Sequence, residues 1–96
     1  MQEVDNGFYE RADAHIHLSN DQITEEVGRG KVSASNMYAT ARFNAWVSAC
    51  RCDSSQEMAE HKQETLEYYV GEHRKMLEEN LSDYIANFKS YMRPEV

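Results

Sequence analysis

The stretch Ser33 to Cys52, SASNMYATARFNAWVSACRC, decides the fold because it is apolar on two sides of a helix. At an advance of about 100° per residue, Tyr38 and Ala45 fall on one side. Phe43 and Trp46 fall roughly opposite them. A helix that is apolar on two sides needs a partner on each of them. The stretch therefore predicts the central helix of a small all-α domain, which we place at about residues 33–51.

A first helix is expected before it, at about residues 7–27, because apolar or small residues recur there every three or four positions. Asn6 is the expected N-cap, and Gly28 is expected to end the helix. A short connector at residues 28–31 would then lead into the central helix. The residues that form this first seam are Phe8, Ala12, Ile16, Ser19, Ile23 and Val27.

The third helix is expected at about residues 55–92, because Ser54 and Glu57 have the spacing of a capping box. Gly71 and Asn80 are the two candidate points at which this long helix bends. Its apolar seam runs through Leu66, Val70, His73, Leu77, Leu81, Tyr84, Phe88 and Met92. We therefore expect one domain over residues 1–96, an all-α three-helix bundle with a long C-terminal helix that is either straight or bent.

Composition restricts the partners and the compartment. The 96 residues carry a net charge of −7, so their surface repels the phosphates of nucleic acids. No apolar run approaches the roughly 20 residues that span a bilayer, and the N-terminus lacks the apolar core of a secretory signal. Cys50 and Cys52 are too close along one helix to favour a mutual disulfide, which fits a reducing compartment. We expect a cytoplasmic protein that binds neither nucleic acid nor membrane.

Several short segments resemble a family of short bacterial helical proteins that is known only as a domain of unknown function. The resemblance covers the chain from about Phe8 to Phe88, and it implies a small bacterial all-helical protein with no assigned activity. It implies no catalytic residue. The segments are Phe8-Tyr9, Arg11-Ala12-Asp13, Tyr38-Ala39, Ala41-Arg42-Phe43-Asn44-Ala45, Met76-Leu77-Glu78-Glu79-Asn80-Leu81, Asp83-Tyr84-Ile85 and Asn87-Phe88.

A candidate ligand site lies on one edge of the central helix, where Ser35, Tyr38, Arg42 and Trp46 fall together. A guanidinium beside two aromatic rings suits a small anionic ligand. The alternative interpretation is structural: Arg42 pairs with a carboxylate such as that of Asp13, and this is the interpretation that we favour.

Metal binding and catalysis are both disfavoured. Asp13, His17 and Asp21 form a column at four-residue steps, which is more typical of a solvated helix surface than of a metal site. The Glu-x-x-His spacing of di-iron bundles is missing before His61 and His73. We expect no metal, no other cofactor and no enzymatic activity.

Assembly is the function that the sequence favours, because the third helix is much longer than its two partners. Its apolar seam must either fold back near Asn80 or be covered by a second copy. We expect a two-fold symmetric homodimer that serves as a binding or assembly module, and a further protein partner is an open alternative. The residues expected in the shared core are Leu81, Tyr84, Ile85 and Phe88.

Overall fold

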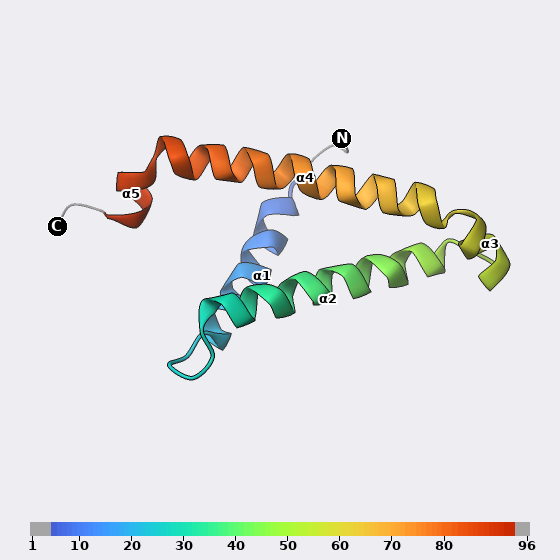
Figure 1. Ribbon diagram of the computed structural model, residues 1–96, viewed down its shortest axis with the longest axis horizontal. Coiled ribbons are helices and arrows are strands. Elements are labelled where there is room, and N and C mark those ends of the chain that lie inside the picture. The colour runs from blue at the N-terminus through green and yellow to red at the C-terminus, as the bar shows by residue number, and fades with distance from the viewer. Residues whose placement is uncertain (1–4, 94–96) are drawn as a thin grey trace. The chain divides into compact units, whose positions relative to one another are not determined.

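The computed structural model describes residues 5–93, and within them it contains five α-helices and no β-strand (Figure 1). The all-α class predicted from the sequence is therefore confirmed. The number of helices is not, because the predicted third helix is divided into three. The helices are α1 (Phe8–Gln22), α2 (Arg29–Cys50), α3 (Ser55–Glu60), α4 (Lys62–Ala86) and α5 (Phe88–Met92).

The chain divides into two compact units, Met1–Arg51 and Cys52–Val96. Unit 1 holds α1 and α2, and unit 2 holds α3, α4 and α5. The expectation of a single three-helix domain stays a prediction.

Helix α1 ends at Gln22, five residues before its predicted end, because the residues that follow close a loop on themselves. Ile23 is extended, with φ −77° and ψ 122°. The Thr24 hydroxyl accepts a hydrogen bond from the Val27 N–H at 3.0 Å, and the Thr24 N–H donates to the Val27 carbonyl at 2.9 Å. Threonine hydroxyls that bond locally to the backbone compete with helix formation. The apolar spacing of Ile23 and Val27 therefore predicted a helix where the chain makes a loop.

Helix α2 begins at Arg29, four residues before the predicted start, so the predicted connector is also wrong. Gly28 is the N-cap of α2, with φ −72° and ψ 166°, rather than the glycine that ends α1. A glycine such as Gly30 costs a helix about 1 kcal/mol relative to alanine. Burying Val32, which is only 5% exposed in the first turn of α2, contributes about 1.5–3 kcal/mol. The free energy gained by burying Val32 exceeds the cost of Gly30, so the helix extends through the glycine.

Helices α1 and α2 contact each other near the loop that joins them and diverge from there (Figure 1). The Asn36 side-chain amide donates to the Ser19 hydroxyl at 2.8 Å, which ties the two helices together. Val32 is the one buried apolar side chain among residues 5–93. Unit 1 is thus a helical hairpin held at one end.

The start of α1 is fixed by a carboxylate that precedes the helix. The Asp5 carboxylate accepts the Gly7 N–H at 2.9 Å and forms an exposed ion pair with Arg11 at 2.8 Å. The hydrogen bond from Arg11 holds the pKa of Asp5 below its ordinary value. The N-cap position is occupied by Gly7 and not by the predicted Asn6.

The capping box at the start of α3 is confirmed. The Ser54 hydroxyl accepts the Glu57 N–H at 3.1 Å, and the Glu57 carboxylate accepts the Asp53 N–H at 3.0 Å. Helix α3 then ends at His61, where φ is −95° and ψ is 3°, and α4 begins directly afterwards. The sequence pattern continues through this break, so spacing did not reveal it.

Helix α4 is continuous through both predicted bend points. Asn80 lies inside the helix, and its side-chain amide donates to the Met76 carbonyl at 2.8 Å, four residues back. Gly71 is helical as well, and a Cβ added there would meet nothing within 4 Å. The helix ends instead at Asn87, where φ is −120° and ψ is 30°. Of the two alternatives left open for this helix, a bend at Asn80 is therefore wrong, and the chain turns seven residues later.

We expect Ser54→Ala to lower the free energy of unfolding by about 1 kcal/mol, because it removes the side-chain acceptor for one N–H at the start of α3. Ser55→Ala is the matched control, since Ser55 is the first residue of α3 rather than its cap. Urea denaturation followed by circular dichroism measures both. Equal losses in the two variants would show that the Ser54 hydroxyl has no capping role.

Candidate functional site

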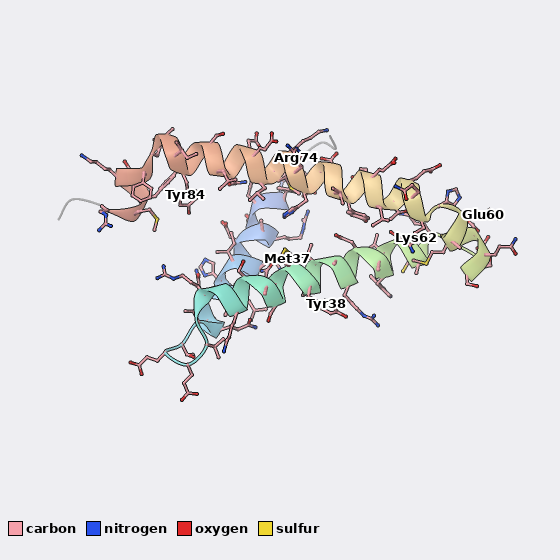
Figure 2. The ribbon with its side chains drawn as sticks, viewed as in Figure 1. Met37, Tyr38, Glu60, Lys62, Arg74 and Tyr84 are labelled. Carbon is pink, nitrogen blue, oxygen red and sulfur yellow. The ribbon has the colours of Figure 1, made fainter. Side chains whose placement is uncertain are left out.

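The predicted ligand residues all lie on α2. Ser35, Tyr38, Arg42 and Trp46 are exposed, with Tyr38 69% and Trp46 60% accessible. Met37 and Tyr38 occupy different sides of the helix (Figure 2). The indole of Trp46 lies 5.5 Å from the ring of Phe43, centroid to centroid, with 37° between the planes. These four residues therefore form an open edge of one helix.

The Asp13 partner that we favoured for Arg42 is wrong within unit 1. Arg42 is exposed, and among the described residues of unit 1 its guanidinium makes no ion pair with Asp13 or with another carboxylate. Arg42 and Asp13 lie on two different helices, α2 and α1, which are in contact only near their shared loop. An anion-binding role of this edge stays a prediction.

We accordingly expect Arg42→Ala to change the free energy of unfolding by no more than about 0.5 kcal/mol, as for other exposed residues without specific partners. Arg11→Ala provides the contrast, because Arg11 does form an ion pair with Asp5. Thermal melts of the two variants measure the effect. A loss of several kcal/mol in Arg42→Ala would show that its guanidinium has a structural partner.

The described residues contain neither a cluster of metal-ligating side chains nor a helix that could span a membrane. Within residues 5–93 no three His, Cys, Asp or Glu side chains come together as metal ligands, and the Asp13, His17, Asp21 column does not form such a group. Cys50 is exposed at the end of α2. Among the described helices, none is both long enough and apolar enough to cross a membrane.

A row of residues at helical spacing runs along α4 in unit 2, and we name it the α4 seam. It consists of one histidine, His73, and five apolar residues. All five apolar side chains are about half exposed or more, with Val70 the most accessible at 64%. The five are Leu66 at 48%, Val70 at 64%, Leu77 at 48%, Leu81 at 54% and Tyr84 at 48%.

Beyond the α4 seam the chain turns back in a feature that the sequence did not predict. The Asn87 amide donates to the Asp83 carbonyl and to the Asp83 carboxylate, both at 3.0 Å. The other oxygen of that carboxylate accepts the Tyr91 hydroxyl at 2.9 Å. The rings of Tyr84 and Tyr91 lie 4.7 Å apart, and Figure 2 shows Tyr84 on the side of α4 where α5 returns. We call this arrangement the C-terminal hook.

The hydrogen bond to Asp83 raises the pKa of Tyr91 above its ordinary value. The neutral hydroxyl is the form that is favoured in the folded chain. The stabilisation from this bond is therefore complete below the ordinary pKa of tyrosine, and it is lost as the pH rises through the raised pKa. The hydroxyl of Tyr91 therefore keeps the proton that it donates to Asp83 throughout the neutral range.

The four residues predicted to form a dimer core lie on both sides of the turn at Asn87. Leu81, Tyr84 and Ile85 lie on α4, and Phe88 is the first residue of α5. All are exposed, from 48% for Tyr84 to 77% for Ile85. We call these four residues, which lie where α4 ends and α5 begins, the patch at the end of α4. The end of α4 is held in place by hydrogen bonds among Asp83, Asn87 and Tyr91. The one feature of the sequence that pointed to this turn was an asparagine near the C-terminus.

Comparisons with known proteins agree with the helical class. A solved structure, described as "NMR structure of the protein NB7890A from Shewanella sp", is similar to this chain with 38% sequence identity and a TM-score of 0.78. The similarity covers 99% of this chain and 100% of that one. No curated protein matches the chain. The family described as "Protein of unknown function (DUF3144)" matches residues 8–85, from the start of α1 to the last turn of α4. The chain belongs to this family of unknown function, as the resemblance in its sequence predicted.

Proposed function

We propose that this protein is a homodimeric assembly module without catalytic activity, and that its two copies associate through unit 2. The apolar side chains that a second copy would cover lie on the α4 seam and on the patch at the end of α4. Leu81 and Tyr84 belong to both, and Ile85 and Phe88 complete the patch.

The observation that carries this proposal is the continuity of α4 from Lys62 to Ala86. If the chain had folded back at Asn80, the same chain would have covered the part of the seam near its C-terminal end. The helix runs through Asn80, and its seam residues are 48–64% exposed. Apolar strips of this length on a soluble protein are typical of surfaces that bind a partner.

The expected strength of this association follows from the area that remains to be covered. A fully buried Leu, Val or aromatic side chain contributes about 1.5–3 kcal/mol of stabilisation. Each of the five apolar seam residues is about half exposed, so about half of that contribution remains to be gained on binding. Two copies together would gain roughly 8–15 kcal/mol. Association itself costs about 4 kcal/mol or more, which leaves at most roughly 4–11 kcal/mol. The middle of this range corresponds to a micromolar dissociation constant.

Sedimentation equilibrium of the intact chain tests the proposal directly. We expect the average mass to rise with concentration, from that of one chain of 11.2 kDa towards twice that value, between about 1 and 500 µM. A mass of one chain over the whole range would overturn the dimer. The α4 seam would then be covered within the chain or by another protein.

A small anion bound beside Arg42 is the second candidate function. It is supported by an exposed guanidinium that has no carboxylate partner among the described residues of unit 1, on the same edge of α2 as Tyr38 and Trp46. Titration with benzoate, followed by the indole signal of Trp46 in NMR spectra, tests it. Equal shifts in the intact chain and in Arg42→Met would exclude a specific anion site.

A further inference from the structure

We propose that Asn6 is a site of spontaneous deamidation and that the contacts at the start of α1 keep this reaction slow. These contacts join the Asp5 carboxylate, the Gly7 N–H and the Arg11 guanidinium, and we call them the α1 cap. Asn6 and Gly7 form the one Asn-Gly pair in the sequence. The inference concerns covalent chemistry within unit 1 and does not depend on the proposed homodimer.

An Asn-Gly pair deamidates when the backbone attacks the asparagine side chain. The Gly7 nitrogen loses its proton to hydroxide and forms a bond to Cγ of Asn6, and the side-chain amide leaves as ammonia after taking a proton from water. Water then opens the cyclic imide at one of its two carbonyl carbons, which leaves aspartate or isoaspartate at position 6. Glycine has no Cβ that would hinder its own nitrogen or restrict the backbone. In the unfolded chain, Asn6 is therefore the asparagine expected to react first.

The first argument is the hydrogen bond made by the attacking group. The Gly7 N–H, which must lose its proton before the attack, donates to Oδ1 of Asp5 at 2.9 Å. An anionic nitrogen at this position would face a carboxylate, and two like charges so close together destabilise each other. The hydrogen bond from Arg11 holds the pKa of Asp5 below its ordinary value. Asp5 therefore accepts the hydrogen bond of Gly7 but is a poor base for removing its proton.

The second argument is the shape of the backbone. The Phe8 N–H donates to the Asp5 carbonyl at 3.1 Å, which closes a four-residue turn. Gly7 has φ −98° and ψ 1°, the values of the third residue of a type I turn. The second residue of such a turn has a ψ of about −30°, which leaves the Asn6 Cβ and the Gly7 nitrogen about 90° apart around the Cα–C bond. The five-membered imide needs these two atoms nearly eclipsed, so the turn must open before the ring can close.

The third argument is the position of Arg11. A Cβ built on Gly7 would lie 2.8 Å from Nη1 of Arg11, so the guanidinium crosses closely over the glycine. From there Nη2 donates to both oxygens of Asp5, at 3.1 and 2.8 Å. The Arg11 N–H donates to the Gly7 carbonyl at 3.0 Å. Arg11 therefore holds Gly7 through its side chain and through its backbone, and some of these contacts must break when the turn opens.

The two products of the reaction affect α1 differently. Isoaspartate carries the backbone through the former side chain, which adds one carbon to the chain between Asp5 and Gly7. The turn that the Phe8 N–H closes cannot keep its shape with this extra carbon. Aspartate leaves the backbone unchanged and adds a negative charge before the helix, where the helix dipole favours it. The α1 cap therefore protects the start of the helix mainly against isoaspartate.

The rate of deamidation tests the inference. The intact chain, Asp5→Ala and Arg11→Ala are incubated at neutral pH, then digested and analysed by mass spectrometry for aspartate and isoaspartate at position 6. We expect the folded intact chain to react several-fold more slowly than the same chain unfolded in guanidinium chloride. We expect each variant to react about fivefold faster than the folded intact chain, because each loses a hydrogen bond of the α1 cap and opens more often.

Asp13→Ala is the matched control, because Asp13 is an exposed carboxylate further along α1 that takes no part in the α1 cap. We expect it to react at the rate of the intact chain, and circular dichroism checks that every variant keeps its helices. Equal rates in the folded and the unfolded intact chain would overturn the inference. So would an unchanged rate in Asp5→Ala, or a slower one, which would show that Asp5 removes the proton of Gly7. Equal acceleration in Asp13→Ala would assign the effect to a general loss of stability and would also overturn it.

Discussion

Leu81→Asp should convert the protein from a dimer to a monomer, with the dissociation constant raised at least about 100-fold. Leu81 is 54% exposed in a single chain, so its replacement leaves the folded chain largely undisturbed. In the proposed dimer the same position is covered, and each copy would bury an unpaired carboxylate there. Sedimentation equilibrium across the micromolar range measures the change, and circular dichroism checks that α4 is retained.

The matched control for this result is Leu18→Asp on α1. Leu18 has nearly the same exposure as Leu81, 58%, but lies in unit 1. The substitution Leu18→Asp makes the same chemical change to an exposed leucine outside the proposed interface, so we expect the dimer to persist. If both variants became monomeric, or if neither did, the α4 seam would not be the dimer surface. If Leu81→Asp lost its helix while the intact chain had the mass of a monomer, Leu81 would be required within the chain.

Val32→Asp should give the largest loss of stability of any single substitution in unit 1. Val32 is 5% exposed and is the one buried apolar residue among those described. Its replacement by Asp removes the apolar burial and places a carboxylate where water is excluded. Together these two effects should lower the free energy of unfolding by about 3 kcal/mol or more. We expect α1 to detach from α2. Thermal melting measures the loss, and the NMR signal of the Asn36 side-chain amide reports the separation.

Val27→Asp is the control for this substitution. Val27 makes its loop contacts through backbone atoms, and its side chain is 39% exposed. We expect a change of about 0.5 kcal/mol or less. Retention of the Asn36 signal in Val32→Asp would show that the contact between the helices does not depend on Val32. Unit 1 would then be held by the hydrogen bond to Ser19 and the loop.

The class of fold and one helix start were predicted from local sequence. Apolar residues at helical spacing, with no proline before the C-terminus, indicated helices throughout, and the described residues are helical with short breaks. The capping box was predictable because Ser54 and Glu57 act across three residues of one chain segment, independently of the rest of the protein. Features determined by such short-range bonds can be derived from residue types and spacing.

The helix ends that were predicted wrongly depend on interactions that apolar spacing does not encode. The spacing of Ile23 and Val27 is helical, but hydrogen bonds of Thr24 hold these residues in a loop. Asn80 and Asn87 each donate a side-chain hydrogen bond to the carbonyl four residues back. After Asn87 the chain turns back, and the Tyr91 hydroxyl donates to the Asp83 carboxylate in the last turn of α4. The same residue type therefore continues the helix in one place and ends it in the other.

The candidate sites show the same division. The sequence determined which side chains share a face of a helix: the edge around Arg42 on α2 and the seam on α4. The tertiary structure decided what those faces contact, because burial depends on neighbours that are distant along the chain. Within unit 1 it buries Val32 and leaves Arg42 without a carboxylate partner among the described residues, and within unit 2 the apolar side chains of the α4 seam are 48–64% exposed. Helical periodicity fixes the direction of a side chain, whereas its partner is fixed only when the helices pack.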